Sequence, residues 1–335
     1  MSRSLEPVTH QPKSHPEWNE SYYLCFSDRK NRLSGMTRLG FKPNKGEAMA
    51  FFLLFLPDGS VAGYQTVGTI KGYPARLKAG GMVHEIRADG SCRYRFNGKM
   101  AVTKDPECFP RAREHPELIS KVLRVRMDLR FTPLNQTYEY SEHMTPESLD
   151  LGRKSGDEHW EQIALIDGEV TLGDEVCILD NVMGQRDHTH GVRDWTGVGN
   201  WLYYVVWFNT ELAVNPAAIV ADDGRISTGG FLFKNGRNIP IKSMRIIDQK
   251  FRDGILPVSS ELQLEDADEV MHILKGKAGP VVPLPFKDEH GNVSVLAQSF
   301  GSFELDGVQG GYGGFETLRV VQRSTRSTCG NDALI

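Results

Sequence analysis

The sequence predicts an all-β protein built from antiparallel sandwiches or barrels. Short runs rich in β-branched and aromatic residues recur along the chain, separated by Gly, Pro, Asn and Asp turn signals. Helical periodicity is nearly absent, and no G-x-G-x-x-G or P-loop motif follows a candidate strand. Repeated hairpins over 335 residues favour a sandwich or a barrel over alternating βαβ units.

The first half of the chain reads as a series of hairpins after a polar, flexible tail at 1–16. A strict alternation from Arg124 to Phe131 places apolar residues on one face and charged residues on the other, as in a half-buried strand. The best helix candidate is 110–122. Further strands are predicted at 21–26, 35–40, 49–56, 61–66, 84–88 and 91–96.

The polar segment 141–158 is rich in Gly, Pro and Ser and predicts a domain boundary. We therefore expect an N-terminal β domain at 17–145, a C-terminal β domain at 155–325 and a tail at 326–335. Residues 200–209 are apolar on both faces, which predicts a central strand. Other strands are expected at 159–166, 169–172, 176–179, 218–221, 226–233, 244–250, 258–264, 269–274, 293–300 and 317–322.

Composition limits the classes of partner. The net charge of −4 and the pI near 6.2 argue against electrostatic binding of nucleic acid. The longest apolar run, 48–56, is too short for a membrane span, and the polar N-terminus lacks the core of a signal peptide. The five scattered cysteines contain no C-x-x-C pair, which favours a reducing compartment. We therefore expect a cytoplasmic protein.

The densest group of ionisable side chains lies at 184–195, between Gly184 and Trp195. The candidate catalytic residues of this segment are Asp187, His188, His190 and Asp194.

One reading of the segment is a metal site. His188 and His190 are spaced to share one face of a strand, and with Asp194 they resemble the first half of a cupin metal motif. The second half needs a Pro-Gly turn and a further histidine, and His272 and His290 lack that context. The sequence therefore predicts no metal and no nucleotide cofactor, with a cupin-type oxygenase as a third reading.

Acid–base chemistry is another reading. Asp187 and Asp194 lie beside arginines and histidines that can keep one carboxyl ionised and another protonated. A carboxyl in an apolar cavity can keep its proton near neutral pH and act as a general acid. A structural ion-pair network that closes the end of a barrel explains the same residues equally well.

Two further clusters supply candidate substrate contacts. His159 and Glu161 share one face of the strand after the boundary, although solvent-facing polar residues are an equal explanation. The glycine-rich run 310–316 indicates close backbone approach or a kinked strand at a barrel rim, and it carries Tyr312 and Glu316. A flexible hairpin is the plain alternative there.

The motif G-x-R-D-H-x-x-G-x-R-D-W at 184–195 resembles the signature of the hydroxyneurosporene synthase and AttH-type lipocalin-like family. Three other stretches are similar to that family in the same order, at 17–23, 159–162 and 311–316. The chain has His190 where the family usually has an aromatic residue, so this histidine could be an additional acid–base group.

The resemblance implies two packed lipocalin-like barrels that hold a hydrophobic ligand. Similar enzymes hydrate carotenoid double bonds without a redox cofactor or metal, and distant relatives cyclise terpenoids or polyenes. By analogy Asp187 would protonate an alkene, with His188 beside it, while Arg193, Asp194 and Trp195 would shape the site. The resulting cation would be stabilised by aromatic faces, and the candidates are Trp195, Trp201, Tyr203 and Trp207.

These observations predict a cofactor-independent enzyme that hydrates, cyclises or isomerises an isoprenoid- or polyene-like molecule by protonating it. The alternative is a non-catalytic lipocalin-like carrier of a hydrophobic ligand. The predicted substrate-binding residues are His159, Glu161, Arg193, Trp195, Trp201, Tyr203, Tyr312 and Glu316.

Overall fold

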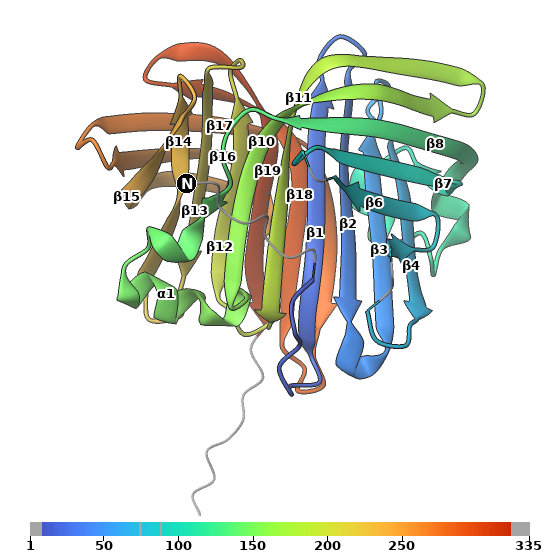
Figure 1. Cartoon of the computed structure of the whole chain (residues 1–335), viewed down its shortest axis with the longest axis horizontal. Coiled ribbons are helices and arrows are strands. Elements are labelled where there is room, and N and C mark those ends of the chain that lie inside the picture. The colour runs from blue at the N-terminus through green and yellow to red at the C-terminus, as the bar shows by residue number, and fades with distance from the viewer. Residues whose placement is uncertain (1–8, 74–75, 88, 323–335) are drawn as a thin grey trace, which may run out of the picture.

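The computed structural model describes residues 9–73, 76–87 and 89–322. Their strands form two antiparallel units that lie side by side in Figure 1. The predicted all-β class is thereby confirmed. Across the described residues, no helix has the length and apolar character needed to cross a membrane. The described cysteines are free, and Cys329 lies outside these ranges, as does the predicted tail at 326–335.

The first unit is a sheet in the order β4-β3-β2-β1-β11-β10-β8-β7-β6-β5, and β9 pairs with β10. An additional pairing of β4 with β7 joins the two sides of this sheet into a ring. Its strands are β1 (Trp18–Asp28), β2 (Leu33–Lys42), β3 (Glu47–Phe55), β4 (Val61–Thr69), β5 (Leu77–Ala79), β6 (Met82–Ile86), β7 (Cys92–Thr103), β8 (Ile119–Pro133), β9 (Tyr138–Glu139), β10 (Glu158–Leu172) and β11 (Glu175–Val192).

The second unit is a closed barrel in which each strand pairs with the next and the last with the first. A turn at 222–224 joins β13 to β14, with Gly224 at φ 85. Its strands are β12 (Asn200–Trp207), β13 (Leu212–Val220), β14 (Ile226–Lys234), β15 (Arg237–Arg252), β16 (Leu256–Asp266), β17 (Met271–Lys287), β18 (Val293–Leu305) and β19 (Val308–Gln322).

The division between the two units does not fall at the polar segment 141–158. The hairpin of β10 and β11 follows that segment, yet β11 pairs with β1 and β10 pairs with β8. The hairpin thus fills the gap between two strands of the first unit, and the chain enters the barrel only after Val192. The prediction assigns residues 158–192 to the C-terminal domain because they follow the polar segment. The composition of a linker does not show with which strands the next strand pairs.

The predicted helix at 110–122 is wrong. Pro110 and Pro116 lie within this stretch. Together with the residues just before it, the stretch folds as the 3-10 turns η2 (Pro106–Arg111) and η3 (Pro116–Leu118), and strand β8 begins at Ile119. The linker instead carries the α-helix α1 (Pro146–Gly152), which Thr145 caps by accepting a hydrogen bond from the amide of Ser148. The other short turns are η1 (Pro43–Lys45), η4 (Tyr140–Glu142) and η5 (Arg153–Ser155).

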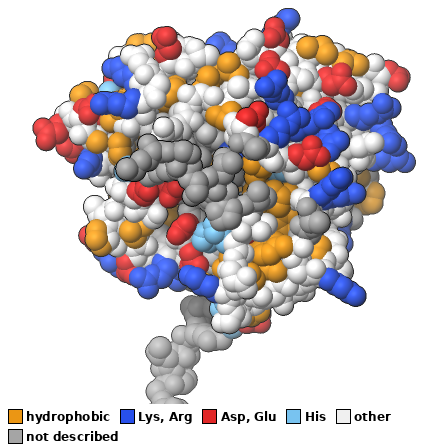
Figure 2. Space-filling model, viewed as in Figure 1, with side chains coloured by type: hydrophobic (Ala, Val, Ile, Leu, Met, Phe, Trp, Pro, Cys, Tyr) orange, Lys and Arg blue, Asp and Glu red, His pale blue; other side chains and the backbone are white. Residues whose placement is uncertain are grey.

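The predicted alternation of β8 is confirmed. Val125, Met127, Leu129 and Phe131 are buried, whereas their charged neighbours face outward. Figure 2 shows many Lys and Arg side chains on the side of the molecule where Figure 1 places β7 and β8. The apolar face of β8 thus belongs to the core of the first unit.

A separate apolar core joins the two units. Phe51 and Leu53 of β3 belong to it, together with Trp207, Phe231 and Val282 of the barrel. Their burial removes apolar surface of both units from water, which holds the units together. The outer faces of β1, β2, β10 and β11 therefore lie against the barrel, and side chains on these faces can form a site between the units.

Candidate active site

A pocket of about 1200 Å³ lies between the two units. The first unit contributes Met36 and Phe51, and the barrel contributes Leu202, Leu284 and Leu296. Its wall also carries several acidic and basic side chains. Small-molecule sites are usually concave and mainly apolar, with polar groups that orient the ligand.

Strand register places Asp187 in this pocket. On β11 it lies opposite Tyr23 of β1 and opposite Glu161 of β10. Side chains alternate between the two faces of a strand, and residues directly opposite share a face. The face of Asp187 is turned toward the barrel, and both Tyr23 and Asp187 line the pocket.

Glu161 is fully buried beside Asp187 and tightly bound by hydrogen bonds. Its Oε1 accepts a hydrogen bond from the Tyr203 hydroxyl at 2.6 Å, and its Oε2 accepts one from Nε2 of Gln185 at 2.7 Å. Burial nevertheless raises the pKa of Glu161 to about 8. The carboxyl is therefore mostly protonated at neutral pH.

His159 connects this carboxyl to Thr189. Its Nε2 lies 2.9 Å from Oε1 of Glu161, and its Nδ1 lies 2.7 Å from the Thr189 hydroxyl. Burial lowers the pKa of His159 to about 4, so the ring is neutral near pH 7. A neutral imidazole between a protonated carboxyl and a hydroxyl can pass a proton in either direction.

The Asp187 carboxyl differs from Glu161 in having no hydrogen-bond partner in the described part of the chain. Among the hydrogen bonds of the described residues, none involves its oxygens. Burial raises its pKa to about 6, as does the nearby Glu161, while His159, Arg193 and Arg38 oppose the shift. Asp187 is thus a pocket-facing acid that gains or loses its proton close to neutral pH.

Glu316 of β19 is another acid that lines the pocket. The Trp201 indole donates a hydrogen bond to its Oε1 at 3.0 Å, and the Gln298 amide donates to its Oε2. Burial raises the pKa of Glu316 to about 7. The barrel therefore faces Asp187 with a carboxyl that is also close to half protonated at neutral pH.

Two guanidinium groups, those of Arg38 on β2 and Arg193 just after β11, line the same pocket. Burial lowers the pKa of both, and repulsion by Arg193 helps to bring that of Arg38 to about 9. The Cζ atoms of Arg193 and Arg38 lie 4.6 and 5.8 Å from the ring centroid of Trp195. The guanidiniums therefore flank one indole ring.

An aromatic group forms the apolar end of the pocket. Trp195 stacks on Phe286, with ring centroids 4.8 Å apart and planes 9° apart, and its ring centroid lies 5.3 Å from that of Trp201. Trp207, by contrast, is fully buried in the core between the units and does not line the pocket. It cannot contact a ligand there.

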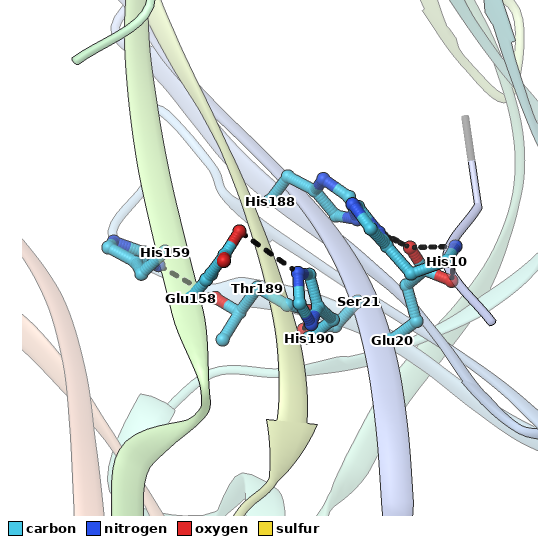
Figure 3. A network of polar contacts seen from close by, with 8 residues as sticks. All are labelled: His10, Glu20, Ser21, Glu158, His159, His188, Thr189 and His190. Atoms are coloured by element: carbon cyan, nitrogen blue, oxygen red, sulfur yellow. Dashed lines mark hydrogen bonds and ion pairs between the residues drawn. The ribbon is translucent and has the colours of Figure 1, made fainter. Parts of the chain in front are cut away.

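His188 and His190 lie on the opposite face of β11 from Asp187. Figure 3 shows both histidines with Glu20 and Glu158. His188 Nε2 lies 2.9 Å from Oε1 of the fully buried Glu20, and His190 Nε2 lies 3.3 Å from Glu158. Adjacent residues of a strand point to opposite faces, so His188 cannot stand beside Asp187 in one site. The predicted catalytic pairing of these two residues is therefore wrong.

The cluster of Glu20, His188 and His190 contacts the N-terminal segment through His10. Nδ1 of His10 lies 2.7 Å from Oε1 of Glu20, and the ring of His10 lies 3.9 Å from that of His190. Asn44 donates hydrogen bonds to the carbonyls of Lys13 and His15. Residues 9–16 thus lie on the first unit instead of forming part of a free tail, while residues 1–8 lie outside the described ranges.

Two other predicted site residues lie away from the pocket. Oδ1 of Asp194 accepts hydrogen bonds from the amides of Thr196 and Gly197, and so closes a turn between the units. Tyr312 packs against Trp207, and the guanidinium of Arg29 lies 5.0 Å from its ring centroid. The contacts of Asp194 and Tyr312 are thus with other protein groups outside the pocket.

Two groups of described residues bring three possible metal-ligand atoms within 4.8 Å of one another. One consists of His10, Glu20 and His188, and the other of His159, Glu161 and Asp187. Hydrogen bonds join Glu20 to His10 and His188, and they join His159 to Glu161. Asp187 forms no hydrogen bond with either member of its group among the described residues, so hydrogen bonds account for the first group but not for the whole of the second.

Sequence reasoning finds His159, Glu161, Asp187, Arg193 and Glu316 but misses Arg38. It also misses Tyr23, Gln185 and Gln298. Arg38 lies in a short strand without a recognisable motif, and it enters the pocket because β2 pairs with β1 next to β11. Without knowledge of that pairing, the sequence contains no signal that sets it apart from the other arginines.

The buried acids predict a pH-dependent stability. Glu161 and Glu316 have folded-state pKa values near 8 and 7, above the ordinary value of 4.5, so the folded state binds more protons than the unfolded state. Their contribution to the free energy of unfolding is complete below that ordinary value and is lost as pH rises through the folded pKa. We therefore expect a higher urea midpoint at pH 6.5 than at pH 8. Between these two pH values His159 stays neutral in the folded state.

Glu161→Gln should reduce the difference between the two midpoints, because the amide cannot ionise. The exposed Glu175→Gln on β11 serves as the control and should leave the difference unchanged. Equal midpoints at the two pH values would contradict the assignment.

Comparisons with known proteins place the fold. A family model described as "Domain of unknown function (DUF7064)" matches residues 5–321. The comparison with curated proteins gives no match. The AttH-like protein NE1406 from Nitrosomonas europaea is a solved structure with TM-score 0.60 and 13% identity, covering 94% of this chain and 98% of that one.

Two further solved structures have the same fold. Kievitone hydratase from Nectria haematococca has TM-score 0.52 and 11% identity, with 94% of each chain covered. CghA has TM-score 0.54 and 10% identity, covering 94% of this chain and 93% of that one. At these identities the likeness shows a shared fold, and the predicted resemblance to AttH-type proteins is confirmed at that level.

Proposed function

The chain belongs to the family described as a domain of unknown function, DUF7064, and we propose that it is an acid–base enzyme acting on a largely apolar small molecule in the pocket between its two units. The reaction class that we propose is protonation of a carbon–carbon double bond, followed by hydration, cyclisation or isomerisation. The chain's own carboxyl groups supply the proton.

The Asp187 carboxyl carries the proposal. It faces the pocket, it has no hydrogen-bond partner among the described residues, and its pKa is raised to about 6. A general acid works best when its pKa lies near the working pH and when no protein group holds its proton. An acid with a purely structural role would instead be hydrogen-bonded, as Asp194 is.

In the proposed reaction Asp187 transfers its proton to one carbon of the double bond. For hydration, a water molecule adds to the other carbon, and its surplus proton returns to the carboxylate. His159 and the protonated Glu161 belong to the same group of ligand atoms within 4.8 Å, so they can resupply a proton to Asp187. Hydration is also the reaction in the name of kievitone hydratase, which shares the fold.

The pocket supports an apolar substrate but changes the expected role of its aromatic residues. Trp195, Trp201 and Phe286 offer flat apolar surfaces to a ligand. The guanidiniums of Arg38 and Arg193 already lie against the ring of Trp195. Because like charges repel, we do not propose that this ring stabilises a free substrate cation.

The test uses heavy water as the reporter of proton transfer. The wild-type protein is incubated in D₂O with a panel of isoprenoids, polyenes and apolar conjugated ketones, and each compound is then analysed by mass spectrometry. We expect at least one compound to gain deuterium, with or without the elements of water, and Asp187→Asn to bind it without this change. If panel members bind to the wild-type protein and none changes in mass, the protein is the non-catalytic carrier instead.

A further inference from the structure

The guanidinium groups of Arg38 and Arg193 have no hydrogen-bond acceptor among the residues that the structure describes. Among the hydrogen bonds and ion pairs of the described residues, none involves either side chain, although both line the pocket. Their Cζ atoms lie 5.8 and 4.6 Å from the ring centroid of Trp195, which faces the same space. The two guanidinium groups together carry ten N–H donors, and none of these has a protein acceptor among the described residues.

Other arginines of this chain show what a partner looks like. On the outer face of the first unit, Arg93 donates to Asp128 at 2.7 Å. Inside that unit, Arg186 donates to the Gln162 side chain at 2.9 Å. Partly buried cations are normally paired in this way, because an unpaired one loses hydration without compensation.

The acids that act on the two arginines do not supply the missing partner. Asp187 and Glu316 attract Arg38 through space, yet neither forms an ion pair with it among the described contacts. Glu316 is bound instead by Trp201 and Gln298. Glu161 is mostly protonated at neutral pH, as described above. The pocket thus carries two cations that the neighbouring acids only partly offset.

We propose that the pocket recognises small molecules that carry an anionic oxygen group, such as a carboxylate, phenolate or enolate, on an apolar body. The inference rests on the proposed function in taking this pocket as the substrate site, and it adds the chemical class of the substrate. The anionic group lies between Arg38 and Arg193, and the apolar body lies against Trp201 and Phe286.

Physical chemistry favours this class over neutral and cationic molecules. A guanidinium presents a planar fork of donors that matches two oxygens of one anionic group, and such charge-assisted bonds are the stronger ones. A cationic ligand would be repelled by both arginines, and a neutral hydrocarbon would leave their donors without acceptors. The bound anion would also stand beside Asp187, so it would fix which carbon of the substrate lies near the acid.

The experiment compares two fluorescent probes of nearly the same shape. 8-Anilinonaphthalene-1-sulfonate carries an anionic oxygen group, whereas N-phenyl-1-naphthylamine is its uncharged counterpart. Each is titrated into the full-length wild-type protein and into Arg38→Met, Arg193→Met and the control Arg130→Met, which alters an exposed arginine on β8. Far-UV circular dichroism verifies that each variant is folded.

We expect the anionic probe to bind the wild-type protein more tightly than the neutral probe. Loss of one charge-assisted contact should weaken the anionic probe about 10- to 100-fold in each pocket variant. The neutral probe should change by less than about threefold, and the control should bind both probes as the wild type does.

Three results would overturn the proposal. The first is equal affinity of the wild type for both probes. The second is that Arg38→Met loses affinity for both probes to the same extent. The third is that Arg130→Met loses as much affinity for the anionic probe as the pocket variants do. The test separates this proposal from the enzymatic one. If the anionic probe binds more tightly than the neutral probe but no compound is ever converted, the protein is a carrier of apolar anions. If a compound is converted and the two probes bind equally well, the substrate is neutral.

Discussion

Asp187→Asn is expected to lower kcat/KM for a converted substrate by about 10²- to 10⁴-fold, the usual contribution of a general acid. The amide has nearly the same shape as the carboxyl but cannot donate this proton. Substrate affinity, measured by titration calorimetry, should change little, because the loss falls on the transition state and not on the bound ground state.

The pH profile gives an independent check on the same residue. Asp187 must be protonated to act as the acid, and its pKa is about 6. The rate should therefore be high below that pH and fall about tenfold per unit above it, as the protonated fraction declines. Asp180→Asn, an exposed change on the same strand, is the control and should keep both the rate and the profile. A fully active Asp187→Asn enzyme would rule out Asp187 as the acid.

Arg38→Met is expected to raise the free energy of unfolding by about 1–3 kcal/mol while reducing activity. Replacing a partly buried charge by an apolar side chain of similar length removes the cost of taking that charge out of water. The neighbouring Asp187 and Glu316 are not left as stranded anions, because both already have raised pKa values and take up protons instead. The wild-type protein is thus expected to be less stable than Arg38→Met, although the proposed ligand requires Arg38.

Urea unfolding at pH 7, followed by tryptophan fluorescence, measures the change in stability. Arg130→Met on the outer face of β8 is the matched control, and it should alter the free energy of unfolding by less than about 0.5 kcal/mol. A less stable Arg38→Met protein would mean that Arg38 stabilises the contact between the two units. Its lack of a protein partner would then no longer support a role in ligand binding.

Local patterns in the sequence predict much of the fold. The alternation of β8, the apolar strand at 200–209 and the hairpin turns all follow from side-chain periodicity and turn chemistry, which act over a few residues. Two residues of the segment 184–195, Asp187 and Arg193, line the pocket, so the predicted functional role of this segment stays a prediction that the pocket is compatible with. Strand pairing between β1 and β11 joins residues far apart in the chain, and no local pattern encodes it.

One error of the sequence reading could have been avoided. Asp187 and His188 are neighbours on a segment predicted to be a strand, so the period of two already separates them onto opposite faces. The role of Asp194 also has a local signal, because Asp-Trp-Thr-Gly is a sequence that favours a side-chain-capped turn. Arg38 has no such signal, since only the sheet order brings it to the pocket.

The unbroken register between β1 and β11 restricts how the chain length can vary. From Trp18 opposite Val192 to Phe26 opposite Gly184, the pairing contains no bulge. Inserting or deleting one residue within 184–192 would exchange the two faces for every residue on one side of the change, and would move either Asp187 or His188 to the wrong side. Proteins that keep both the pocket and the N-terminal contacts should therefore differ in length here only by even numbers of residues.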